Sequence, residues 1–197
     1  MTLTHLTRRR TLLGAGLTLP LWGCGPKLSF KSIDITGANY ALDFELPDTE
    51  GRVRRLADFR GKVVVIFFGY TQCPDVCPTT LQELTQARQM LGDKGASVQG
   101  IFVTIDPERD TPELLREYMK SFDASYVALV PQAEQLAAVT KHFKVYYKKS
   151  PGQTPTSYTM DHTAASFVYD AQGRIRLYTR YGLGAQALAE DLKLLLA

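Results

Sequence analysis

A fully apolar segment, Val63–Phe68, stands just ahead of a cysteine pair, Cys73 and Cys77. The segment has no polar face, which is typical of a strand buried on both sides of a sheet. Pro78 suits a first helical position. Apolar residues then recur at helical spacing, at Leu81, Leu84, Ala87 and Leu91. The chain therefore has to fold so that two thiols lie where a buried strand gives way to a helix.

This position has a chemical consequence for the cysteines. The start of a helix is electropositive, because its first amide N–H groups are unpaired and the helix dipole is positive there. Both effects favour a thiolate over a thiol. Thiolates are soft metal ligands and good nucleophiles, so the pair indicates either metal binding or redox chemistry.

Strand and helix patterns alternate along the rest of the chain. Further strands are expected at residues 101–105, 126–130, 165–169 and 175–179, and further helices at 110–122, 134–143 and the C-terminus. Residues 44–54 predict a small hairpin, and residues 144–160 predict a second, protruding one. The short turn at 170–174 makes the last two strands antiparallel. The expected fold class is α/β: a thioredoxin-like fold with a mixed central sheet flanked by helices, an N-terminal hairpin and an inserted protruding hairpin.

Residues 1–23 have the pattern of an export signal. Three arginines, Arg8–Arg10, precede the apolar stretch Leu12–Trp22. That stretch is shorter than the roughly 18 residues that would span a bilayer. Residues 7–12 resemble a twin-arginine motif, and the general secretion route fits equally well.

The leader ends at the third cysteine, Cys24. Leu21–Cys24 resembles a bacterial lipobox, in which the cysteine is lipidated and becomes the first residue of the mature protein. The alternative is that Cys24 is a third structural thiol. We expect a signal peptide over residues 1–23, a lipidated N-terminus and polar tether over 24–42, and the folded domain over 43–197. The predicted location is the periplasmic face of a bacterial cell envelope, with membrane attachment through Cys24.

Charge gives no support for a nucleic-acid partner. The whole chain carries a formal net charge of +3. Residues 1–23 contain three arginines and no acidic residue, so the remaining chain has a formal charge of zero. A neutral domain lacks the basic surface that binding to phosphate groups requires.

The histidines narrow the chemistry further. His5 lies in the leader, and His142 lies in a helix where a surface position is expected. His162 precedes the strand at 165–169, at a sheet edge where loops lie over the first helix. Alone it would be a hydrogen-bonded turn histidine. Together with Cys73 and Cys77 it makes a plausible copper site, since copper accepts sulfur and nitrogen donors.

Zinc is the competing metal. A closed structural zinc site has four protein ligands. The chain offers three obvious ones, so Asp161 or water would have to serve as the fourth. Met160 is expected to pack in the core rather than to bind metal. Copper is therefore favoured over zinc.

Three motifs together resemble the Sco/SenC family. They are Phe-Gly-Tyr-Thr-Gln-Cys-Pro-Asp-Val-Cys-Pro from Phe68, Val-Thr-Ile-Asp-Pro-Glu-Arg-Asp-Thr-Pro from Val103, and Asp-His-Thr from Asp161. The resemblance covers most of residues 43–197, and the family's copper ligands fall on Cys73, Cys77 and His162.

The resemblance implies a membrane-anchored copper metallochaperone that helps to build the CuA centre of cytochrome c oxidase subunit II. Family members are also proposed to reduce the thiols of the recipient site. Other copper chaperones or thiol reductants are further expected partners. The family often uses a transmembrane helix as its anchor, whereas this chain is expected to use lipid on Cys24.

Three alternatives remain for the cysteine pair. Thiol–disulfide oxidoreductases of this fold usually have two residues between their cysteines and a cis-proline before the late strand. Here the spacing is three, and residues 161–167 contain no proline. A peroxiredoxin would need a threonine where Pro74 stands. A purely structural disulfide would give His162 no role.

The segment Asp106–Asp110 belongs to the family pattern as well. Physically it reads as a strand end, a loop and a helix cap, and we interpret it as structural. A loop close to the copper site or a docking face is the alternative interpretation.

Overall fold

The computed structural model describes residues 28–154 and 157–197. The predicted signal peptide and Cys24 lie outside these residues. At the centre is a six-stranded sheet in the order β1-β10-β9-β4-β5-β6. Its strands are β1 (Ile33–Asp34), β4 (Val63–Gly69), β5 (Val98–Thr104), β6 (Val127–Leu129), β9 (Ala165–Tyr169) and β10 (Ile175–Arg180). β4, β5 and β6 are parallel, and the other neighbours are antiparallel, so the predicted mixed sheet is confirmed.

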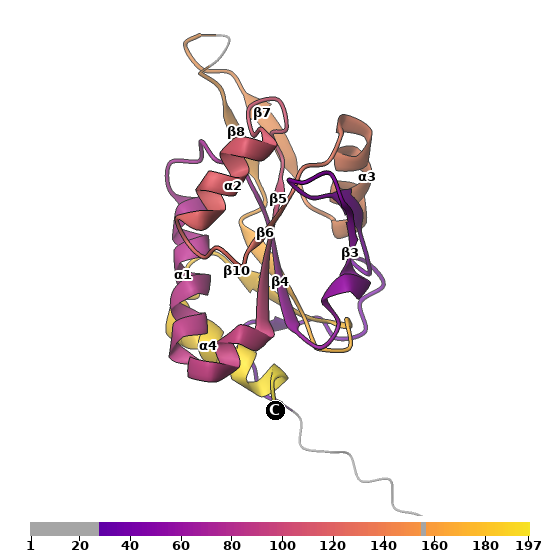
Figure 1. The fold of residues 1–197 in the computed structure, drawn as a ribbon, viewed down its shortest axis with the longest axis vertical. Coiled ribbons are helices and arrows are strands. Elements are labelled where there is room, and N and C mark those ends of the chain that lie inside the picture. The colour runs from indigo at the N-terminus through magenta and orange to yellow at the C-terminus, as the bar shows by residue number, and fades with distance from the viewer. Residues whose placement is uncertain (1–27, 155–156) are drawn as a thin grey trace, which may run out of the picture.

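In the described residues, four α-helices pack against this sheet. They are α1 (Val76–Met90), α2 (Pro112–Lys120), α3 (Ala133–Phe143) and α4 (Ala185–Leu195), with short 3₁₀ helices η1 (Leu56–Phe59) and η2 (Gly92–Ser97). α1 begins two residues before the position predicted from Pro78. Figure 1 shows α1 and α4 on one side of the sheet and α3 on the other. This two-sided cover is the thioredoxin-like arrangement that the sequence predicts.

Strand β4 is buried along its whole length because it has a layer on each face. Phe68 points to the α3 side, where its ring centroid lies 5.1 Å from that of Phe143. Phe67 points the other way and packs against Phe102, with 6.1 Å between ring centroids. Successive side chains of a strand alternate between faces, so an unbroken apolar run is what a strand inside this sandwich requires.

Both predicted hairpins are present. β2 (Glu45–Pro47) pairs with β3 (Val53–Arg55), and β7 (Tyr147–Ser150) pairs with β8 (Thr159–His162). Figure 1 shows the β7–β8 hairpin standing out from one end of the molecule, with the C-terminus at the opposite end. This second hairpin carries His162 at the end of β8.

The segment predicted to be a tether is part of the folded domain from about residue 30. β1 extends the sheet by pairing with β10. The backbone N–H groups of Lys31 and Ser32 donate to the carboxylate of Asp191 at 2.7 and 2.8 Å. Ala41 is fully buried, and its carbonyl accepts a hydrogen bond from Tyr169. The predicted domain start near Asp43 is therefore too late, because a two-residue strand leaves no periodic pattern in the sequence.

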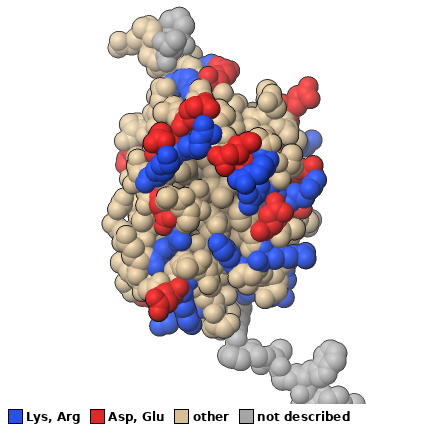
Figure 2. Space-filling model, viewed as in Figure 1, with Lys and Arg blue, Asp and Glu red and all other residues tan. Residues whose placement is uncertain are grey.

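The surface carries both signs of charge. On the face shown in Figure 2, acidic and basic side chains lie beside one another. Ion pairs in the domain include Arg88–Asp123 at 2.6 Å. Among the residues that the structure describes, no helix combines the length and the hydrophobicity that crossing a bilayer would take.

Candidate metal centre

Three predicted ligands come together at one end of the sheet. Cys73 lies in the loop between β4 and α1, Cys77 lies in the first turn of α1, and His162 ends β8. Their two sulfur atoms and one imidazole nitrogen all lie within 4.8 Å of one another. Within residues 28–154 and 157–197 this is the one group of three or more Cys, His, Asp or Glu side chains close enough to hold a metal ion. The sequence therefore located the cluster correctly.

The ring of His162 is oriented toward the thiols. Its Nε2 atom lies 3.5 Å from the sulfur of Cys77, and its Nδ1 atom lies 3.1 Å from the carbonyl oxygen of Thr163. A carbonyl only accepts, so Nδ1 carries a proton in this contact, and Nε2 is the ring nitrogen that faces the thiols. The rings of Phe67 and Tyr70 make edge contacts with the imidazole at 5.9 and 6.0 Å between centroids. A metal-binding histidine is held in one orientation by a hydrogen bond from the ring nitrogen that does not bind the metal. The Nδ1 contact with Thr163 is a bond of this type.

The two thiols have opposite environments. A hydrogen bond from the Cys77 thiol, supported by His162 and by the amides of Asp75 and Cys77, lowers the pKa of Cys73 to about 3. The amide of Cys77 donates to the Cys73 sulfur at 3.4 Å. The pKa of Cys77 is raised, first by its hydrogen bond to Cys73 and then by burial, since its side chain is fully enclosed. The site thus presents a partly exposed thiolate beside a buried thiol, and neither is in a disulfide.

Gly69, the last residue of β4, makes room for the buried sulfur. A Cβ atom added here would lie 2.8 Å from ring carbons of Phe67 and Phe102 and 2.9 Å from the Cys77 sulfur. Real side chains do not pack this closely. The absence of a side chain at Gly69 is therefore a condition for the position of Cys77.

The Asp106–Asp110 segment lies beside the cysteine loop, which was the alternative interpretation of this motif. Asp110 is fully buried and accepts hydrogen bonds from Thr71, at 3.1 Å from the amide and 2.5 Å from the hydroxyl. It also accepts from the hydroxyl of Thr104 at 2.6 Å. Burial raises the pKa of this carboxyl group. Asp110 therefore fixes the backbone two residues ahead of Cys73.

Sequence reasoning missed Thr71 and Asp110 as supports of the site. The feature that could have identified these two supporting residues is the topology of the central sheet. Parallel strands β4 and β5 end at the same edge of the sheet, so the loops that follow them must be neighbours. The motif after the second strand could have been assigned to the site on that ground.

Other residues considered from the sequence do not join the cluster. The carboxylate of Asp161 accepts a hydrogen bond from Ser150 at 2.6 Å, within the hairpin. Met160 is 8 % exposed and belongs to the hydrophobic core. His142 is exposed as expected, and its Nε2 atom accepts the backbone N–H of Leu42 at 3.0 Å. The described residues thus supply three ligand side chains to the cluster and no fourth.

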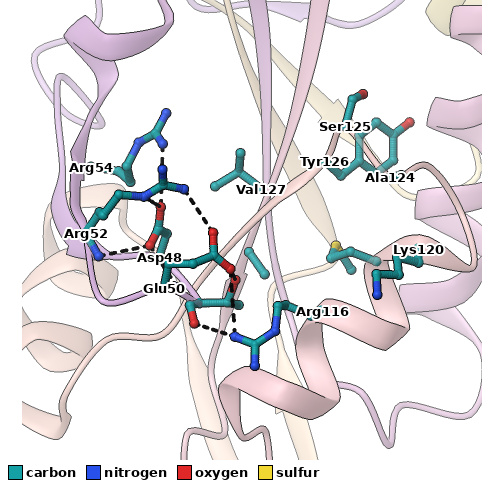
Figure 3. A pocket seen from close by; sticks show the side chains of 13 residues that line it. Asp48, Glu50, Arg52, Arg54, Arg116, Lys120, Ala124, Ser125, Tyr126 and Val127 are labelled. Atoms are coloured by element: carbon teal, nitrogen blue, oxygen red, sulfur yellow. Dashed lines mark hydrogen bonds and ion pairs between the residues drawn. The ribbon is translucent and has the colours of Figure 1, made fainter.

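A hollow of about 290 Å³ lies between the β2–β3 hairpin, α2 and β6. Figure 3 shows ion pairs among four of its charged side chains, Asp48, Glu50, Arg52 and Arg116. Asp48 pairs with Arg52 and Arg54 at 3.1 and 3.5 Å, and Glu50 pairs with Arg52 and Arg116 at 3.0 and 3.8 Å. None of the three candidate ligands lines this hollow. Of these ion pairs, Glu50–Arg116 joins the hairpin to α2.

Fold and site together define a thioredoxin-like protein with two thiols and one imidazole arranged as metal ligands. The SCO1/SenC family profile matches residues 34–197. The chain belongs to the SCO1/SenC family.

Its relatives include mitochondrial and bacterial proteins. The mitochondrial SCO2 homolog of Bos taurus is 37% identical over 153 residues, which are 77% of this chain and 58% of the bovine protein. The SCO2-like protein of Rickettsia felis is 37% identical over 152 residues, which are 77% of this chain and 74% of the other. The chain thus spans rather more than half the length of the bovine relative.

Solved structures show the same fold. Apo Sco1 of Thermus thermophilus is 38% identical, with a TM-score of 0.76 over 87% of this chain and 99% of that one. ScoI of Bradyrhizobium japonicum, solved with copper bound, is also 38% identical, with a TM-score of 0.69 over 77% and 96% of the two chains.

Proposed function

We propose that this protein binds copper through Cys73, Cys77 and His162 and delivers it to the CuA centre of cytochrome c oxidase subunit II. The observation that carries the proposal is the convergence of two sulfur atoms and one imidazole nitrogen within 4.8 Å. Copper accepts this mixed, soft donor set with low coordination number, whereas a closed zinc site takes four ligands. The copper-bound ScoI of Bradyrhizobium japonicum and the oxidase-assembly role implied by the family resemblance support the same function.

Copper is the cargo in this proposal. Both thiols start reduced, because a disulfide has no thiolate to offer. Cys73 is partly exposed while Cys77 is buried, so thiolates and imidazoles of the recipient reach the site from the Cys73 side. They replace the ligands one at a time, and ligand exchange of this kind releases no free ion.

An anaerobic copper titration of the reduced chain tests the proposal. We expect one copper ion per chain and, for Cu(II), a sulfur-to-copper charge-transfer band. Cys73→Ser or Cys77→Ser should abolish the band. An unchanged stoichiometry and spectrum in the double serine variant would rule out this site.

A second candidate function is reduction of the recipient's CuA-site cysteines, and the contrast between the two thiols favours it. The Cys73 thiolate would attack a disulfide of the recipient and form a mixed disulfide. Cys77 would then displace the recipient, which leaves as a dithiol, while Cys73 and Cys77 become a disulfide. A thiol reductant would have to return the pair to the reduced state. A recipient disulfide that the reduced chain leaves oxidised would exclude this role.

We further propose that the chain is a lipoprotein anchored at the periplasmic face of a bacterial envelope through Cys24. The order of arginines, apolar stretch and cysteine in residues 8–24 supports this. Cys24→Ser should abolish labelling by palmitate and leave the leader uncleaved, whereas Cys73→Ser should label normally. Labelling that survives the loss of Cys24 would refute the anchor.

A further inference from the structure

The hairpin that carries His162 is fastened to the domain by one aromatic side chain. Tyr158 immediately precedes β8 and is 7 % exposed. Its ring lies between two cations, with the guanidinium carbon of Arg109 at 3.5 Å and the ammonium of Lys149 at 3.8 Å from the ring centroid. Its hydroxyl donates to Asp106 at 2.7 Å. The ring and the hydroxyl are thus both held by partners, two of which belong to the Asp106–Asp110 segment.

Arg109 connects that segment to the cysteine loop. Its Nη1 atom donates to the side-chain oxygen of Gln72 at 3.0 Å and to the backbone carbonyl of Tyr158 at 2.8 Å. Its Nε atom pairs with the carboxylate of Asp106, and the side chain is only 13% exposed. Gln72 is the residue before Cys73. The guanidinium group of Arg109 therefore connects the loop that carries Cys73 to the start of β8, the strand that carries His162.

The hairpin needs such a connection. β7 and β8 pair with each other and form no ladder with the six-stranded sheet. An isolated two-stranded hairpin is marginally stable in water. The buried side chain of Met160 and the edge contacts of the His162 ring are further attachments near the thiols. The distance between His162 and the thiols thus depends on side-chain contacts. Among them, Arg109 donates to Gln72 in the cysteine loop, and Tyr158 donates to Asp106 in the neighbouring segment.

We propose that Arg109 and Tyr158 are positioning residues that latch the β7–β8 hairpin to the cysteine loop and so determine how firmly His162 holds copper. The proposal rests on the proposed copper-binding function. With the latch closed, the imidazole stays within bonding reach of an ion held by the two thiolates. With it loosened, the thiolates keep the ion and the imidazole contact weakens. Cu(II), which relies more on the nitrogen donor than Cu(I) does, should feel the difference most.

The test compares the purified full-length chain with three latch variants and a control. Tyr158→Phe removes only the hydroxyl bond to Asp106, and Arg109→Gln removes the guanidinium. Arg109→Lys keeps the charge but loses the planar guanidinium group that spans Gln72, Tyr158 and Asp106. The control is Glu117→Gln, which breaks an exposed pair with Lys120 on α2. Exposed pairs of this kind contribute little.

Three measurements are made on each chain: Cu(II) and Cu(I) affinity by chelator competition, nitrogen coupling to Cu(II) by pulsed electron spin spectroscopy, and amide hydrogen exchange of the hairpin without copper. We expect the latch variants to lose about 10-fold or more in Cu(II) affinity, the range for residues that orient metal ligands, and to lose less in Cu(I) affinity. Nitrogen coupling should weaken while the sulfur-to-copper band remains, and exchange at residues 159–162 should accelerate. Glu117→Gln should match the unmodified chain.

The possible outcomes distinguish failure of the latch proposal from failure of the proposed copper-binding function. An unmodified chain that binds no copper overturns the proposed function and the latch with it. Normal copper binding with unchanged affinity, coupling and exchange in Tyr158→Phe and Arg109→Gln overturns the latch alone. Full recovery in Arg109→Lys would also overturn it, because charge and not bridging would then suffice. Parallel loss of sulfur and nitrogen signals in Tyr158→Phe would show a general structural role and count against the latch as well.

Discussion

At the scale of single residues, the same amino acid takes two different states in this site. Position at a helix start predicts thiolate character for both cysteines, and it gives the right answer for Cys73 alone. The side chain of Cys77 is fully buried beside Gly69, and its thiol donates a hydrogen bond to the sulfur of Cys73. Burial and a donated hydrogen bond both favour the protonated form, and together they outweigh the helix start. A sequence does not show which of two thiols will be enclosed, because that depends on packing against distant strands.

The first prediction concerns the reactivity of Cys73. Its pKa of about 3 lies far below the ordinary value of a thiol, so it stays a thiolate throughout pH 5–8. Its rate of alkylation by iodoacetamide should change less than about twofold over that range, because only the thiolate reacts. An ordinary thiol would lose nearly tenfold in rate for each pH unit below its pKa. Labelling of each cysteine is followed by peptide mass spectrometry, with Cys77 expected to stay unmodified.

Cys77→Ala provides the matched control for this prediction. It removes the hydrogen-bond donor that contributes most to the low pKa of Cys73. The alkylation profile of Cys73 should then shift to higher pH. A tenfold fall per pH unit in the unmodified chain, or an unchanged profile in Cys77→Ala, would contradict the assignment.

At the scale of secondary structure elements, long and periodic segments were predictable from the sequence, and the two-residue strand β1 was not. Val63–Phe68 and the stripe from Leu81 to Leu91 follow the periods of a strand and a helix, and β4 and α1 form there. β1 has two residues, too few to show any period. The hydrogen bonds of Arg109 could not be predicted either, because its partners Gln72 and Tyr158 lie 37 and 49 residues away along the chain. The cysteine–histidine cluster was predictable because strand ends and motifs located it, whereas its supporting hydrogen bonds required coordinates.

The second prediction concerns the attachment of β1 to α4. Asp191 is 1 % exposed and accepts the backbone N–H groups of Lys31 and Ser32. Asp191→Ala would leave both amides without this acceptor, and the free energy of unfolding should fall by about 2 kcal/mol. Urea unfolding measures the change. Glu190→Gln, which removes an exposed pair with Lys31, should stay within about 0.5 kcal/mol of the unmodified chain. A loss no larger than that in Asp191→Ala would show that β1 adds nothing to stability.

At the scale of the whole molecule, the ligands come from two separately built parts. Cys77 lies on core helix α1, and Cys73 lies on the loop between core strand β4 and that helix, while His162 lies on a hairpin outside the six-stranded sheet. The low pKa of Cys73 comes first from the hydrogen bond of Cys77, with a smaller contribution from His162, so thiol chemistry depends mainly on the core. The complete three-ligand site depends on how the hairpin packs against the core. This division makes it possible to remove one activity and keep the other.

The last prediction uses that division to separate copper delivery from thiol reduction. Both functions need the cysteines, and only copper binding needs the imidazole. His162→Ala should keep a dithiol that still exchanges with a disulfide partner, because exchange depends on thiolate character and access. Its Cu(II) binding should collapse, and its Cu(I) binding should weaken less, since two thiolates can hold that ion.

In a strain that relies on this protein, His162→Ala should lose cytochrome c oxidase activity at limiting copper and regain part of it when copper is added. Added copper bypasses a delivery defect by mass action, whereas it does nothing for a recipient whose cysteines remain oxidised. Cys73→Ser/Cys77→Ser is the matched comparison, because it removes both activities and should respond less to copper. Full oxidase assembly by His162→Ala at limiting copper would favour the thiol reductase as the main function, since the dithiol alone would then suffice.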